Sequence, residues 1–195
     1  MGKIFCVMGK SASGKDTIYR KLLEDKSLNL ERIVSYTTRP IRAGESEGKE
    51  YHFTDEEGYK KLESSGKVVE TRVYETAYGP WRYFTVDEGI EEDKDYLIIG
   101  TLEQYVALRD HFGADRVEAL YIDLDDGERL QRALKRERKP ENRKFAEMCR
   151  RFLADAEDFS EDKLNHENIT NRFINEDFDE CVGNIKNYIG SILGR

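Results

Sequence analysis

The sequence predicts an α/β fold with a mostly parallel core sheet, formed by a single domain. Strand-like apolar runs alternate with helix-like segments along the 195 residues, which is the pattern of parallel strands joined by helices. The first run, Ile4–Met8, is apolar throughout and stops at Gly9, as expected of a strand buried on both faces of such a sheet. The length fits one domain, and the chain contains no internal repeat and no long linker.

The remaining elements follow from local patterns. A capping box that begins at Thr54 starts one helix, Gly113 closes another, Asp125 caps a third and Pro140 begins a fourth. Helices are expected at residues 16–23, 54–64, 102–112, 126–138, 140–159 and 178–193. Strands are expected at residues 4–8, 33–36, 68–74, 96–99, 117–124 and 172–174, with an irregular aromatic-rich segment at 77–82.

The charge balance limits the classes of partner. The chain carries 32 Lys or Arg against 40 Asp or Glu, a net charge of −8. The electrostatic field of a protein with this net negative charge repels anions, which argues against general binding to nucleic acid or to an acidic membrane. An anionic ligand must therefore be held by a local cluster of positive charge.

Cysteine usage and hydropathy indicate the compartment. Cys6, Cys149 and Cys181 are scattered and odd in number, which suits neither a disulfide framework nor a metal site and favours a reducing environment. No window approaches the roughly 18 apolar residues of a spanning helix. We expect a cytoplasmic protein without a membrane anchor.

A phosphate-binding loop follows the first strand. Residues 9–15 match the spacing G-x-x-x-x-G-K between a strand and a helix. Its glycines let backbone N–H groups surround a phosphate, and Lys15 places an ammonium against the outer phosphates. Asp16 stands where a Ser or Thr usually meets Mg²⁺, with Thr17 next, so either residue could reach the metal. The predicted ATP-binding residues of this loop are Gly9, Lys10, Ser11, Ala12, Ser13, Gly14, Lys15, Asp16 and Thr17.

A second motif lies at residues 35–53. Two arginines three residues apart, Arg39 and Arg42, are followed by the Tyr51 hydroxyl, and such groups can converge on one phosphate. The whole run resembles guanylate kinases, with the pattern S-x-T-T-R-x-x-R-x-G-E-x-x-G-x-x-Y-x-F matched at every position.

The resemblance extends over most of the chain. It implies that Glu70 pairs with the guanine N1 and 2-amino groups, and that Tyr78 binds the GMP phosphate. It further implies a mobile lid whose arginines are Arg132, Arg136 and Arg138, followed by a helix with the pattern of Arg150, Ala154 and Glu157. Residues 129–151 contain ten Lys or Arg and three Glu, which suits a segment that closes over polyphosphate.

The pattern of the family is broken in two places. Pro80 and Trp81 stand where the family carries a Ser or Thr that reads the guanine O6. Gly100 and Thr101 stand where the family carries acidic residues.

The resemblance as a whole implies a P-loop kinase fold with a small NMP-binding insertion and an arginine-rich lid. The core would comprise about residues 1–36, 89–125 and 151–195, the GMP-binding part 37–88 and the lid 126–150. The implied catalytic residues are Lys15, Arg39, Arg136, Arg138 and Arg150, with Arg132 joining the ATP site. The implied GMP-binding residues are Ser35, Arg39, Arg42, Tyr51, Glu70 and Tyr78.

The expected reaction is the Mg²⁺-dependent transfer of phosphate from ATP to GMP, by a monomer or homodimer. Two alternatives stay open. The Gly-Lys-Asp sequence also resembles the related ribose bisphosphate phosphokinases, which transfer phosphate to a sugar phosphate. A guanylate kinase-like module without catalysis, which recognises a phosphorylated partner, is the other.

Overall fold

The core of the molecule is a five-stranded parallel sheet. The computed structural model describes residues 1–76, 79–139 and 143–195. The strand order is β2-β7-β1-β8-β9, with every neighbouring pair parallel. The strands are β1 (Ile4–Met8), β2 (Glu31–Arg32), β7 (Tyr96–Ile99), β8 (Val117–Asp123) and β9 (Arg172–Ile174). The predicted α/β fold with a mostly parallel sheet is confirmed.

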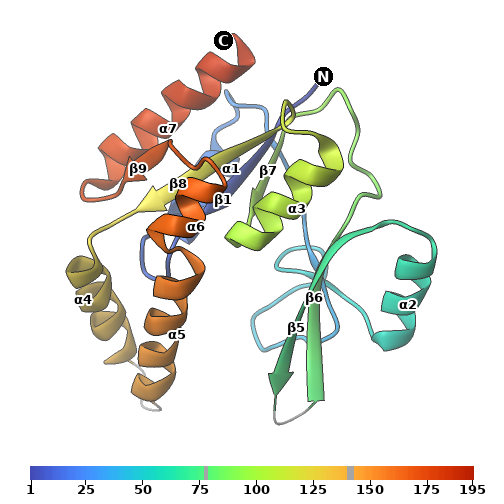
Figure 1. The fold of residues 1–195 in the computed structure, drawn as a ribbon, viewed down its shortest axis with the longest axis horizontal. Coiled ribbons are helices and arrows are strands. Elements are labelled where there is room, and N and C mark those ends of the chain that lie inside the picture. The colour runs from blue at the N-terminus through green and yellow to red at the C-terminus, as the bar shows by residue number, and fades with distance from the viewer. Residues whose placement is uncertain (77–78, 140–142) are drawn as a thin grey trace.

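Helices cover both faces of this sheet. Alternate side chains of β1 point to opposite faces, so Phe5 and Val7 pack in one cluster while Ile4, Cys6 and Met8 pack in the other. Helices α1 (Lys15–Glu24) and α7 (Phe178–Leu193) complete the first cluster, and α3 (Leu102–Phe112) and α6 (Glu161–His166) complete the second. Figure 1 shows this layering. Burial on both faces explains the uninterrupted apolar run of β1.

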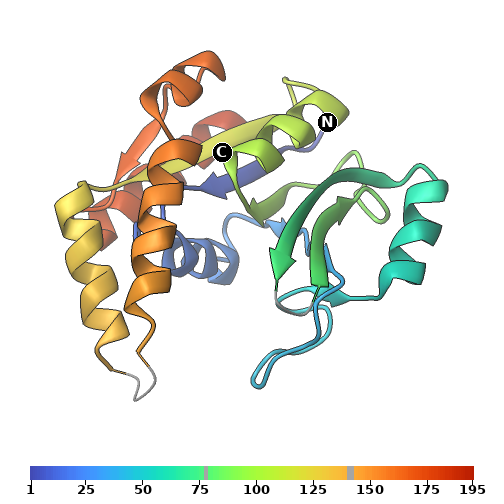
Figure 2. The same cartoon turned by 60° about the horizontal axis from the view of Figure 1, so that its bottom comes forward.

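A second, mixed sheet is attached to one side of the core. Its order is β4-β3-β6-β5, and the strands are β3 (Tyr36–Thr37), β4 (His52–Phe53), β5 (Val68–Thr76) and β6 (Gly79–Val86). Helix α2 (Glu56–Ser64) packs on it through Tyr59, which meets Phe84 and Val86. Helices α4 (Asp126–Glu137) and α5 (Phe145–Asp158) extend on the opposite side of the molecule, as Figures 1 and 2 show.

Several boundaries differ from expectation. The strand predicted at 33–36 is wrong, because the chain leaves the core sheet there: the Ile33 amide still donates to the Leu97 carbonyl at 3.1 Å, and β3 begins only at Tyr36. Residues 79–82 belong to β6, since pairing with β5 makes the segment regular. Asp55, rather than Thr54, caps α2 by accepting from the Gly58 amide.

The last part of the chain is predicted less completely. Helix α5 begins at Phe145, while the start predicted at Pro140 lies outside the described residues. Helix α6 was not anticipated. Strand β9 and helix α7 have the predicted bounds. Within the described ranges, no helix is long and apolar enough to cross a membrane.

Candidate active site

The phosphate-binding loop connects β1 to α1 in a conformation that requires its two glycines. Gly9 has φ of 153°, and a Cβ there would lie 2.4 Å from the Ile122 carbonyl oxygen. Gly14 has φ of 93°, and a Cβ there would lie 2.2 Å from the Asn175 Nδ2. Both positions combine a left-handed backbone with close approach, which only glycine tolerates. The loop is thereby pressed against the ends of β8 and β9.

The loop presents unpaired amides to a polar cavity of about 770 Å³. Within the described residues, the N–H groups of Ala12, Gly14, Lys15 and Asp16 have no acceptor, and they surround the start of α1, where the helix dipole favours an anion. Arg132 and Arg136 of α4 line the other side of this cavity. We call this the donor cavity; its lining comprises Ser11, Ala12, Gly14, Lys15, Asp16, Thr17, Arg20, Arg132, Arg136, Arg151, Asn175, Glu176 and Phe178.

Three of the predicted loop residues do not line the donor cavity. Lys10 turns toward α4, where its Nζ lies 3.3 Å from Asp126 Oδ1. Ser13 is fully buried, and Gly9 serves the turn described above. These three residues therefore contribute to the conformation of the loop and not to the wall of the cavity.

The residues after Lys15 fit a magnesium ion that is shared with nucleotide phosphates. The Asp16 side chain is 78% exposed and borders the donor cavity together with Thr17. Magnesium is usually held by one or two carboxylates plus substrate phosphates. The described residues contain no group of three or more His, Cys, Asp or Glu that could hold a metal by themselves. Asp16 is thus suited to complete a site that the nucleotide largely supplies.

A second cavity of about 900 Å³ adjoins the first. We call it the acceptor cleft; it lies among α1, the β5–β6 hairpin, the start of α3 and α5. Lys15, Asp16 and Arg151 line both cavities. The two spaces therefore meet at the end of the phosphate-binding loop. The other lining residues of the cleft are Ser35, Tyr51, Arg72, Val73, Tyr74, Glu75, Thr76, Trp81, Tyr83, Ile99, Gly100, Thr101, Gln104, Glu147 and Arg150.

A hydrogen-bonded network runs from the lining of the acceptor cleft to Glu70, which is 8% exposed and does not itself line the cleft. Gln104 is 1% exposed, and its Nε2 donates to Ser35 Oγ at 3.1 Å and to Thr85 Oγ1 at 2.8 Å. The Thr85 hydroxyl donates in turn to Glu70 Oε1 at 2.8 Å. The network thus links two predicted GMP-binding residues, Ser35 and Glu70, through groups that the sequence analysis missed. A signal did exist, since a glutamine on the apolar side of the helix predicted at 102–112 is unusual.

Gly100 makes room for this network. A Cβ at that position would lie 2.3 Å from the Gln104 Oε1. Because Gln104 is held at both amide contacts, a larger residue would displace it from Ser35 or Thr85. The glycine that breaks the family pattern therefore has a packing reason in this chain.

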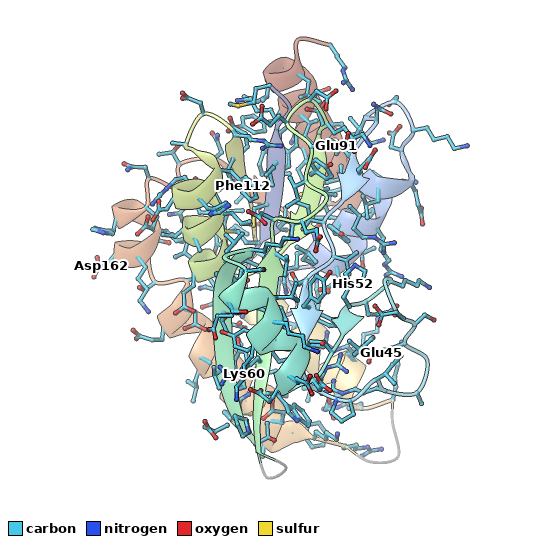
Figure 3. All side chains as sticks on the ribbon, turned by 90° about the vertical axis from the view of Figure 1, so that its right-hand side faces the viewer. Glu45, His52, Lys60, Glu91, Phe112 and Asp162 are labelled. Atoms are coloured by element: carbon cyan, nitrogen blue, oxygen red, sulfur yellow. The ribbon has the colours of Figure 1, made fainter. Side chains whose placement is uncertain are left out.

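Arg39 is placed differently from the sequence expectation. Its guanidinium is 3% exposed and does not line the acceptor cleft among the described residues. Its terminal nitrogens lie 2.7 and 2.6 Å from the two Glu45 oxygens, and its Nε donates to the Tyr83 hydroxyl at 3.1 Å. Figure 3 shows Glu45 on the loop near His52. Arg39 thereby fixes the loop that carries Arg42 and Tyr51.

We expect the Arg39–Glu45 pair to make stability sensitive to acid. Hydrogen bonds from Arg39 lower the pKa of Glu45 to about 2 from its usual 4.5. A carboxyl with a lowered pKa stabilises the fold above the unfolded pKa, and that contribution is lost as the pH falls from about 4.5 toward 2. Chemical denaturation across this range should show the free energy of unfolding of the wild type falling more steeply than that of Glu45→Gln.

The same variant should already be weaker at neutral pH. Removing Glu45 leaves a buried guanidinium without its counter-charge, so Glu45→Gln should lose about 3 kcal/mol of unfolding free energy at pH 7. If the free energy of unfolding depended on pH in the same way in the wild type and in Glu45→Gln, a stabilising Arg39–Glu45 pair would be contradicted.

Two other predicted acceptor-phosphate groups, Arg42 and Tyr51, lie on the loop between β3 and β4. Tyr51 lines the acceptor cleft, and burial raises its pKa, so its hydroxyl keeps its proton at neutral pH and can donate. Arg42 is exposed, with its guanidinium carbon 5.9 Å from the centre of the Trp81 ring. Tyr78 lies outside the described residues.

The predicted lid arginines do not all face the cavities. Arg132 and Arg136 line the donor cavity, and Arg150 lines the acceptor cleft. Arg138 is exposed at the end of α4 and lines neither. Arg151, which no sequence motif singles out, lines both.

Glu147 holds the two arginines of α5 on one side of the helix. Its carboxylate accepts from Arg150 at 2.7 Å and from Arg151 at 2.8 Å. Hydrogen bonds from Arg150 and Arg151 lower the pKa of Glu147 to about 2. The carboxylate is therefore ionised at neutral pH and keeps both guanidinium groups beside the acceptor cleft.

A buried arginine ties the phosphate-binding loop to α4 and α5. The Arg129 Nε donates to the Ser11 carbonyl at 3.0 Å, and its Nη2 lies 3.0 Å from Asp155 Oδ2. Asp155 also accepts from the Ser11 amide at 2.8 Å. Arg129 pairs with Asp126 as well. The sequence gives no means of separating this structural arginine from its neighbours in the same basic segment.

The parallel sheet and the glycine loop between β1 and α1 are those of a P-loop kinase fold, and two cavities adjoin at this loop. The family model for guanylate kinase matches residues 1–192. The chain belongs to the guanylate kinase family, whose function is the phosphorylation of GMP.

Individual relatives agree with the family. The chain is 31% identical to the guanylate kinase of Zymomonas mobilis, over 96% of this chain and 83% of that protein. It is 32% identical to the guanylate kinase of Anaplasma phagocytophilum, over 69% of this chain and 63% of that protein, just under two thirds of its length. The crystal structure of guanylate kinase from Anaplasma phagocytophilum matches with a TM-score of 0.64 and 24% identity, covering 97% of this chain and 85% of the other. That structure supports the fold.

Proposed function

We propose that this protein transfers the terminal phosphoryl group of ATP to GMP and releases ADP and GDP. The observation that carries the proposal is the meeting of the donor cavity and the acceptor cleft at Lys15. A phosphate oxygen of GMP would attack the terminal phosphorus of ATP. A new P–O bond forms, and the bond to the bridging oxygen breaks, so that ADP leaves with the electron pair. Such transfer depends on alignment and on neutralisation of charge.

The proposed donor site consists of the loop amides, Lys15 and the arginines of α4. The free N–H groups of residues 12 and 14–16 would bind the donor phosphates, and Lys15 would contact the transferring group. Arg132 and Arg136 would neutralise the phosphates from the opposite side. Mg²⁺ bound with ATP would supply further charge neutralisation, and Asp16, with Thr17, would hold it.

The proposed acceptor site uses the loop that follows β3. Arg42, Tyr51 and Tyr78 would hold the GMP phosphate, while Arg39 contributes by fixing this loop and through the one N–H that its contacts leave over. Ser35 and Glu70 would read the guanine at the base of the cleft. Residues 37–88 would then form the GMP-binding part.

The proposed lid comprises residues 126–150. Arg136 and Arg150 face the cavities from α4 and α5, and closure would bring them over the transferring phosphoryl group and exclude water. Arg138 would have to move to take part, since it lines neither cavity in this conformation.

The proposed enzyme acts as a monomer or homodimer. We place the activity in the cytoplasm, which the free thiols of Cys6, Cys149 and Cys181 support.

The experiment that tests the proposal is a coupled ADP-release assay with Mg-ATP. GMP, dGMP, AMP, IMP and ribose 1,5-bisphosphate are offered at equal concentration. GMP turnover well above the rest supports the proposal. Turnover of the sugar phosphate alone would favour the related phosphokinase. Absence of turnover, without thermal stabilisation by ATP, would favour the binding module.

A further inference from the structure

We infer that Arg72 and Glu70 together read the base, with Arg72 donating to the guanine O6 and N7. This inference rests on the proposed function and assigns the discrimination between GMP and AMP to Arg72. It supplies a donor that the sequence lacks at positions 80 and 81, where Pro80 and Trp81 cannot offer the expected hydroxyl.

Arg72 lies at the base of the acceptor cleft beside the predicted base-reading groups. It belongs to β5, and its side chain is 16% exposed. Its Nε donates to Glu70 Oε2 at 3.0 Å, and Glu70 is 8% exposed. Ser35, Thr101 and Gln104 line the same cleft. The guanidinium therefore forms part of the wall that a base would face.

The donors of Arg72 are not exhausted by its protein contacts. Beyond the Nε, its Nη1 lies 3.5 Å from Thr101 Oγ1 and its Nη2 lies 3.5 Å from Glu70 Oε1. Both distances are at the long limit for a hydrogen bond. A guanidinium has five N–H groups, so each terminal nitrogen keeps one that has no acceptor among the described residues. Two neighbouring donors are thus available to a ligand.

The acceptor groups of Glu70 are likewise only partly used. Oε1 accepts from Thr85 at 2.8 Å and Oε2 accepts from Arg72. An ionised carboxylate offers about four lone-pair positions. Thr85 and the Nε and Nη2 of Arg72 take three of them, so Oε2 keeps capacity for a donor of guanine. Thr85 and Arg72 hold the carboxylate in place for that contact.

The edge of guanine matches this pair of side chains. O6 and N7 are adjacent acceptors that a guanidinium fork can bind together, and N1–H and the 2-amino group are adjacent donors. Adenine keeps N7 but offers a 6-amino donor where guanine has O6, so AMP would set a donor against one arm of the guanidinium and leave that arm unpaired. The donors of Arg72 and the adjacent acceptors of Glu70 therefore favour a purine that carries an oxo group at C6.

The charge of the pair argues against a phosphate at this position. Arg72 is bound to a carboxylate that is itself nearly buried, and that carboxylate would repel a phosphate dianion. The phosphate groups of ATP and GMP have better positions at Lys15, Arg42 and Tyr51. A base edge that carries both donors and acceptors suits the pair better.

The test compares three substrates and three variants in the ADP-release assay. GMP and IMP carry O6, whereas 2-aminopurine riboside 5′-monophosphate lacks it. Arg72→Gln should lower kcat/KM for GMP and for IMP by about 5- to 150-fold, and should lower the value for the 2-aminopurine analogue, which keeps N7 but lacks O6, by a clearly smaller factor. Arg72→Lys keeps the charge beside Glu70 without the fork, and should give the same pattern with a smaller loss.

Arg82→Gln is the matched control. Arg82 lies in the neighbouring strand β6, pairs with Glu56 and lines neither cavity, so its removal should leave all three substrates unchanged. Equal losses of Arg72→Gln on all three substrates would overturn the inference, because the residue would then act on the shared ribose phosphate or on the fold. No loss on GMP would also overturn it.

Calorimetric titration of the monophosphates without ATP keeps the inference separate from the reaction. A wild type that binds GMP and IMP more tightly than the 2-aminopurine analogue, with this preference reduced in Arg72→Gln, supports the role of Arg72 even where GMP is not phosphorylated. A wild type that binds all three equally would overturn it. If the wild type binds GMP with this preference but does not phosphorylate it, only the proposed function is contradicted, and the role of Arg72 is not.

Discussion

Lys15→Ala should lower kcat by about 10³-fold or more while leaving the protein folded. Lys15 is the one lysine that lines both the donor cavity and the acceptor cleft among the described residues. Its ammonium can therefore follow the phosphoryl group from donor to acceptor, and no second ammonium replaces it there. The variant should fold because, among the described residues, the Lys15 Nζ makes a single ion pair, with Asp16 at 3.7 Å.

The measurement is steady-state ADP release, accompanied by thermal unfolding with and without Mg-ATP. Lys21→Ala is the control, since Lys21 is exposed in the last turn of the same helix and lines neither cavity. It should match the wild type. Near-normal turnover by Lys15→Ala would exclude the phosphate-binding role of the loop. If Lys15→Ala unfolds at the same temperature as the wild type without ligand, its loss of turnover comes from the missing ammonium and not from a damaged fold.

The features that the sequence predicted well are those that local pattern determines. The run Ile4–Met8 and the turn after Ile99 are fixed by burial and by glycine, so β1 and β7 begin and end where expected. The phosphate-binding loop is local as well, because its amides and Lys15 lie within one turn and the start of one helix. The second sheet was harder, since β6 is regular through its pairing with β5, and β3 through its pairing with β4 and β6.

The parts of the candidate site that were missed depend on contacts between distant segments. Gln104 meets Ser35 across 69 positions of sequence, and Arg129 meets Ser11 across 118. An arginine in a basic segment has no local mark that separates a buried structural role from an exposed one. Arg39 shows the converse: its motif is local, but its guanidinium is turned toward Glu45 by the loop that closes around it.

The basic segment therefore divides into two groups in the structure. Arg129 is buried against Ser11, Asp126 and Asp155, and anchors α4 and α5 to the phosphate-binding loop. Arg136 lies two turns further along α4, lines the donor cavity and has no ion-pair partner among the described residues. An anchored helix that carries an unpaired guanidinium can place that charge on a phosphate without breaking an existing pair.

Arg136→Ala should consequently lower kcat by about 10²- to 10³-fold, the usual cost of removing one group that neutralises transition-state charge. The KM for GMP should change little, because Arg136 borders the donor cavity and not the acceptor cleft. Steady-state kinetics with each substrate varied in turn separates the two effects.

Lys135→Ala is the matched control for this variant. Lys135 is exposed on the same turn of α4, carries the same charge and lines neither cavity. A general electrostatic effect of the basic segment would reduce both variants alike and would weaken as salt is added. A specific contact between Arg136 and the phosphates would reduce Arg136→Ala alone and would persist at high salt, because a closed lid shields the contact from the solvent. Equal kinetics of the two variants would show that the charge of α4 acts only through the solvent and would contradict a lid arginine at position 136.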